Sequence, residues 1–121
     1  MENKDFEFRE NLKDRTKKFA LRIIKLSQSL TSSLEANVIR KQILRSGTSV
    51  GANYRASCRA RSNAEFFSKM SIVIEETDET LFWLELLQES NIVKSELLQD
   101  LYQENEEILK IMATARANSK K

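Results

Sequence analysis

The stretch "RSGTSVGANYRASCRAR", residues 45–61, contains both glycines of a 121-residue chain that has no proline. Gly47 and Gly51 are four residues apart, and serines, threonine, alanines and four arginines surround them. Three structures suit such a composition: a loop, a nucleotide-binding turn, or a helix that lets another element come close. The choice among them decides the fold.

The apolar spacing on either side of the glycines favours a helix. One repeat at alternating intervals of three and four runs without a phase break through Ile39, Ile43, Ser46, Val50, Asn53 and Ser57. A phosphate-binding loop is excluded, because no strand precedes the stretch and the G-x-x-x-x-G-K pattern is absent. A glycine inside a helix costs about 0.5–1 kcal/mol relative to alanine. We expect close helix packing at Gly47, Gly51 and Asn53 to offset that cost.

The same spacing recurs in three other parts of the chain and predicts a bundle. Helices are expected at about 6–32, 37–59, 63–90 and 95–117, with Ser62 and Glu65 forming a capping box at the start of the third. The composition agrees, with 31% charged residues, 40% hydrophobic residues and very little glycine. The sequence therefore predicts one all-α domain, residues 1–121, folded as an antiparallel up-and-down four-helix bundle.

Positive and negative charges are separated along the chain, although the net charge is only +2. Residues 36–64 hold six basic side chains and no acid, whereas residues 75–107 hold eleven acids and one base. Arginine suits bidentate contacts to phosphate, and few aromatic residues accompany these bases, so we expect recognition of the phosphate backbone rather than of bases. The predicted nucleic-acid-binding residues are Lys41, Arg45, Arg55, Arg59 and Arg61.

The third predicted helix is apolar on more than one face. Its core stripe is expected at Phe67, Met70, Ile74, Thr77, Leu81, Leu84 and Gln88. A chain of this length has too small a core to bury the remaining apolar residues as well, and self-association is a common way to cover them. We expect a homo-oligomer whose interface contains Phe66, Phe82, Trp83, Leu86 and Leu87.

The residues needed for catalysis or metal binding are not found together in the sequence. Carboxylates cluster between Glu75 and Glu79, but di-iron bundles require Glu-x-x-His pairs, and the chain has no histidine. The single Cys58 lacks a histidine base. We expect no enzyme activity, metal or cofactor. No signal-type run or apolar segment of 18 residues occurs, so we expect a cytoplasmic protein that does not enter a membrane.

Residues 41–87 closely resemble the bacterial four-helix bundle proteins named after the ribosomal-RNA intervening-sequence protein. The resemblance rests on Gln42, Arg45, Ser46, Thr48, Ser49, Val50, Ala52, Asn53, Glu65, Phe66, Glu76, Glu79, Trp83 and Leu84. It implies a homopentameric ring with a basic surface. A related branch of this family serves diversity-generating retroelements as an accessory protein, together with a reverse transcriptase and nucleic acid. Many members have an acid and a glycine after the matching asparagine, whereas Asn53 is followed here by Tyr54 and Arg55, which makes the second helix more basic.

Two functions of different classes follow from the sequence. The first is a non-catalytic oligomer that binds RNA or DNA through backbone phosphates, with strong salt dependence. The second is a protein-interaction scaffold or accessory subunit that recognises a partner protein and does not bind nucleic acid. Binding of purified protein to RNA, measured against salt, distinguishes them.

Overall fold

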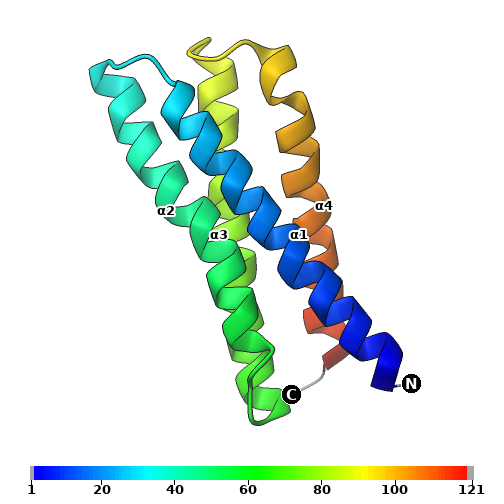
Figure 1. Ribbon diagram of the computed structural model, residues 1–121. Coiled ribbons are helices and arrows are strands. Elements are labelled where there is room, and N and C mark those ends of the chain that lie inside the picture. The colour runs from blue at the N-terminus through cyan, green and yellow to red at the C-terminus, as the bar shows by residue number, and fades with distance from the viewer. Residues whose placement is uncertain (1, 120–121) are drawn as a thin grey trace.

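Four helices account for nearly all of the chain. The computed structural model describes residues 2–119, with side chains from residue 4 onward, and contains α1 (Glu2–Ser29), α2 (Leu34–Ser57), α3 (Asn63–Glu89) and α4 (Ser95–Ser119). The helices run alternately up and down, with the α1–α2 and α3–α4 connections at one end and the α2–α3 connection at the other (Figure 1). The predicted all-α antiparallel bundle is confirmed.

Capping side chains set the helix boundaries. The Ser33 hydroxyl accepts a hydrogen bond from the Ala36 amide at 3.0 Å, so α2 begins at residue 34 rather than at the expected 37. At the start of α3, Ser62 Oγ accepts from the Glu65 amide at 3.0 Å. The Glu65 carboxylate in turn accepts from the amide of Arg61, at 2.6 Å, which completes the expected capping box one residue further back.

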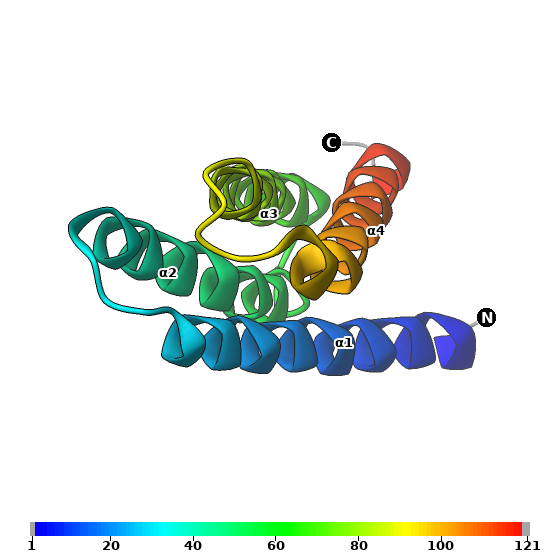
Figure 2. The same cartoon turned by 90° about the horizontal axis from the view of Figure 1, so that it is seen from above.

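The helices pack around α2 and α3. Helix α2 lies against α1 on one side and α3 on the other, α3 also packs on α4, and the α1–α4 contact is the smallest of the four. Seen from above, α1 forms one edge of the molecule and α3 lies on the far side of α2 (Figure 2). All four helices contribute to the core, whose largest fully buried side chains include Phe19, Ile23, Ile43, Tyr54, Met70, Leu84, Leu87, Leu98, Ile108 and Met112.

Both glycines lie inside α2 and face α1. A Cβ atom added at Gly47 would lie 2.8 Å from Cγ1 and Cγ2 of Ile23, and one added at Gly51 would lie 3.4 Å from the backbone carbonyl of Thr16. The two helices therefore approach closely at these positions. Asn53 is half-buried, and its Nδ2 donates to the Ser49 carbonyl of its own helix.

The buried face of α3 differs from the expected stripe by one residue in places. The buried positions are Met70, Val73, Thr77, Thr80, Leu84 and Leu87. Leu87 has no exposed surface, so its assignment to a subunit interface was wrong. Phe66, Trp83 and Leu86 are half-buried against the core, and Phe82 is 49% exposed. The error arose because a helix that is apolar on several faces has more than one plausible stripe.

Candidate nucleic-acid interface

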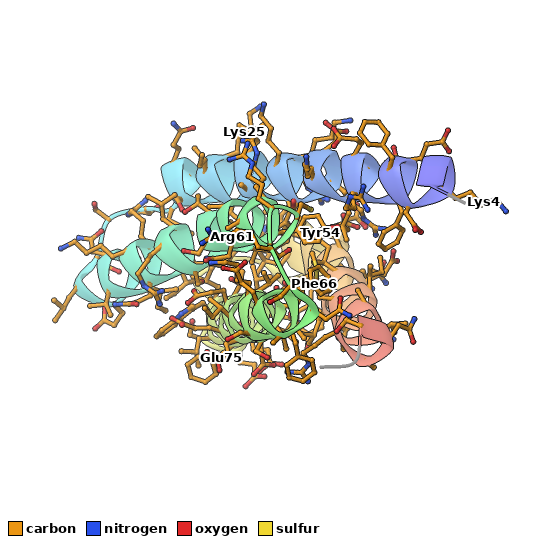
Figure 3. The ribbon with its side chains drawn as sticks, turned by 90° about the horizontal axis from the view of Figure 1, so that it is seen from below. Lys4, Lys25, Tyr54, Arg61, Phe66 and Glu75 are labelled. Carbon is orange, nitrogen blue, oxygen red and sulfur yellow. The ribbon has the colours of Figure 1, made fainter. Side chains whose placement is uncertain are left out.

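The charge separation of the sequence becomes a separation between two halves of the bundle. Residues 15–64, which cover most of α1, all of α2 and the connection to α3, hold eleven bases and only Glu35 as an acid. The acid-rich residues 75–107 lie in α3 and α4. Lys25 on α1 and Glu75 on α3 project from opposite sides of the molecule (Figure 3). A polyanion therefore meets a favourable field on the α1–α2 side.

All five predicted phosphate-binding side chains are exposed, and four of them lie in two places without an ion pair among the described residues. Lys41 and Arg55 are on α2, about 21 Å apart at 1.5 Å per residue. Arg59 and Arg61 follow α2 in the connection to α3, since the helix ends at residue 57 and not at the expected 59. Three arginines therefore gather at the α2–α3 end of the bundle.

The fifth predicted residue, Arg45, is held by acids of α3. Its guanidinium donates to Glu76 at 3.1 Å and also to Glu79, whose carboxylate accepts a second hydrogen bond from Trp83 Nε1 at 3.0 Å. Arg45 remains 48% exposed, but its charge is already compensated by two carboxylates. We therefore regard it as a weaker candidate for phosphate than the other four.

Four residues that carry the family resemblance, Arg45, Ser46, Glu76 and Glu79, form hydrogen bonds between α2 and α3. Beneath the ion pairs, Thr80 Oγ1 donates to Ser46 Oγ at 2.8 Å, and both residues are fully buried. Arg45 and Ser46 are neighbours on α2, and Thr80 directly follows Glu79 on α3, so the buried hydrogen bond and the ion pairs join the same parts of the two helices. These four residues of the shared motif therefore have a structural role in the pairing of the two central helices.

Two further bases of the cationic half also make structural contacts. Arg40 donates to the carbonyls of Ser27 and Leu30 and so closes the end of α1. Arg15 donates to both carboxylate oxygens of Glu104 at 2.7 Å and to Glu107 at 2.6 Å. The hydrogen bonds to Glu104 raise the pKa of Arg15. The same hydrogen bonds form a polar link between α1 and α4.

Sequence reasoning missed the contribution of α1 to the basic surface. Residues 15–34 hold five bases and no acid, and this signal was present in the sequence. Helix α1 lies beside α2, and an open groove of about 450 Å³ runs between them. The groove is lined by Glu10, Lys13, Asp14, Lys17, Ala20, Thr48, Gly51, Ala52 and Arg55.

The described residues contain no cluster of side chains suited to a metal ion. No group of three or more carboxylate or thiol side chains suited to a metal occurs between residues 4 and 119. Cys58 is half-buried next to Tyr54, and burial, together with this thiol, raises the pKa of the Tyr54 phenol. Nor does any helix in the described part of the chain have the length and hydropathy to cross a membrane.

Comparison with known proteins identifies the family. The family model for the 23S rRNA-intervening sequence protein matches residues 11–114. The chain belongs to this family. A crystal structure of a protein of unknown function from the S23 ribosomal protein family of Bacteroides thetaiotaomicron VPI-5482 is 37% identical, with a TM-score of 0.83. The match covers 90% of this chain and 97% of the other. No curated protein matches the sequence significantly.

Proposed function

We propose that this family member is a non-catalytic homo-oligomer that binds RNA or DNA through backbone phosphates. The separation of charge between the two halves of the bundle carries the proposal. Four exposed cations, Lys41, Arg55, Arg59 and Arg61, lie within residues 15–64, which contain eleven bases and one acid. Neutralising phosphates releases bound counterions, which supplies affinity without base recognition.

Apolar residues on the surface of α3 support self-association. Ile72 is 43% exposed and Phe82 is 49% exposed, and Phe82 packs edge-on against Trp83 with ring centroids 5.0 Å apart. Burying these side chains against other copies of the chain removes apolar area from water. A pentameric ring is the assembly that the family resemblance implies. Native mass measurement on protein purified at low salt tests both the stoichiometry and bound nucleic acid, and a monomer without nucleic acid contradicts both claims.

Salt-dependent binding tests the proposed function directly. Anisotropy of labelled structured RNA and duplex DNA is measured between 50 and 200 mM salt. For about four phosphate contacts on duplex DNA, affinity is expected to fall roughly 100-fold across this range. The double variant Arg55→Glu and Arg59→Glu should abolish most of the binding. Lys94→Glu with Lys110→Glu makes the same charge change outside the basic half and should retain more of it.

Equal loss in the two double variants would show that only net charge matters, and unchanged binding in the first would refute the proposed surface. The second candidate function, a protein-interaction scaffold, is favoured by the exposed Ile72 and Phe82 on α3, within the acidic half of the bundle. In that case, the purified protein binds neither RNA nor DNA at any salt concentration and captures one defined partner protein.

A further inference from the structure

The groove between α1 and α2 brings cations from two helices together. Gly51 lets α2 approach the backbone of Thr16, where an added Cβ would already be in contact at 3.4 Å. Lys17 directly follows Thr16 on α1, and Arg55 lies one helical turn beyond Gly51 on α2. Both side chains line the groove. The close approach of the helices is therefore what places these two cations around one space.

The acids of the groove are already paired. The Glu10 carboxylate lies 2.8 Å from Lys13 Nζ, and the Asp14 carboxylate lies 3.0 Å from Nζ of Lys18, a residue outside the groove lining. Lys17 and Arg55 form no ion pair within the described part of the chain. Their two positive charges are the uncompensated ones in the groove.

Short side chains keep the groove open. Ala20, Gly51 and Ala52 form much of its lining, and the volume of about 450 Å³ is in the range of small-ligand sites. The Thr48 hydroxyl donates to the Leu44 carbonyl at 2.7 Å and so remains directed at its own helix. An anion that enters is therefore met mainly by the ammonium of Lys17 and the guanidinium of Arg55.

We propose that this groove holds one phosphodiester of a bound RNA or DNA strand, with Lys17 and Arg55 contacting its oxygens from the two helices. The inference rests on the proposed function and adds to it a specific contact on α1. An arginine fork and a lysine point charge suit a phosphate whose bases face away from the protein. The contact requires α1 to be packed on α2, because neither helix alone presents both cations.

A matched pair of lysine variants tests the contact. Lys17→Gln removes a groove cation, whereas Lys25→Gln removes an exposed cation of the same helix that does not line the groove. The logarithm of the binding constant falls linearly with the logarithm of the salt concentration, and loss of one duplex phosphate contact reduces this salt slope by about 0.9. The reduction corresponds to roughly eightfold weaker binding at 0.1 M salt. We expect this change for Lys17→Gln and little change of slope for Lys25→Gln. Neither position is buried, so circular dichroism of both variants should match the parent.

Acetylation of lysine amines gives a readout that does not depend on affinity changes. With saturating duplex DNA, Lys17 should be protected from acetylation while Lys25 stays reactive. If the protein binds DNA but Lys17→Gln keeps the parent salt slope and Lys17 stays reactive, the groove contact is wrong and the proposed function survives. If neither RNA nor DNA binds the parent protein, both fail together.

Discussion

Alanine substitution of the two glycines should have different effects, although both lie in α2 one turn apart. At Gly47, the new methyl group would lie 2.8 Å from both γ carbons of Ile23, a fully buried residue. Rotation about the Cα–Cβ bond of Ile23 still leaves one γ carbon facing the new methyl group, and the Ile23 Cβ itself lies 3.2 Å away, so the backbone of α1 must shift. At Gly51, the nearest atoms lie at 3.4 Å, which is ordinary contact.

The magnitude follows from comparing the two variants. Each gains about 0.5–1 kcal/mol of helix propensity over glycine, and this gain cancels in the difference between them. Overpacking a core by one methyl group typically costs about 1–3 kcal/mol. Gly47→Ala should therefore be less stable than Gly51→Ala by about 1–3 kcal/mol, while Gly51→Ala should equal or slightly exceed the parent.

Urea unfolding, followed by circular dichroism at one fixed protein concentration, measures the difference. With a slope of about 2 kcal/mol per molar urea, the two midpoints should differ by roughly 0.5–1.5 M. Adding Ile23→Ala to Gly47→Ala makes room for the methyl group, so the double variant should be more stable than the sum of the single effects predicts. Equal midpoints for the two glycine variants, or a more stable Gly47→Ala, would refute the close-packing explanation.

Two predictions concern polar contacts of the bundle. The hydrogen bond from Tyr102 to Glu85, 2.9 Å long, raises the pKa of Tyr102 to about 12 from about 10. Because the folded chain holds this proton more tightly than the unfolded chain, the hydrogen bond stabilises the fold fully below pH 10 and loses this effect as the pH approaches 12. Between pH 10 and 12, urea unfolding should therefore show a smaller loss of stability for Tyr102→Phe than for the parent protein. Arg15→Gln breaks the paired contact with Glu104 and should lower the free energy of unfolding by about 1 kcal/mol. Lys18→Gln breaks an exposed ion pair with Asp14 and should lower it by about 0.5 kcal/mol or less. Equal effects of the two variants would contradict a distinct link between α1 and α4.

Prediction from sequence succeeded where local spacing decides the outcome and failed where it does not. The number of helices, their antiparallel order and the helical setting of Gly47 and Gly51 follow from apolar repeats within each segment. The assignment of Leu87 to an interface failed, because α3 is apolar on several faces and only its neighbours decide which one is buried. The hydrogen bond from Asn53 to its own helix is also not evident from its place in the repeat.

The sequence by itself determined an all-helical bundle with its bases and acids in different halves, because periodicity and charge order are properties of neighbouring residues. Only the tertiary structure decided which bases remain available to a polyanion. Arg45 is held by acids 31 and 34 residues away in the chain, and Arg15 by an acid 89 residues away, whereas Lys17 and Arg55 line one groove without ion pairs in the described residues. Such pairings depend on how two helices align when they pack, and local spacing does not contain that alignment.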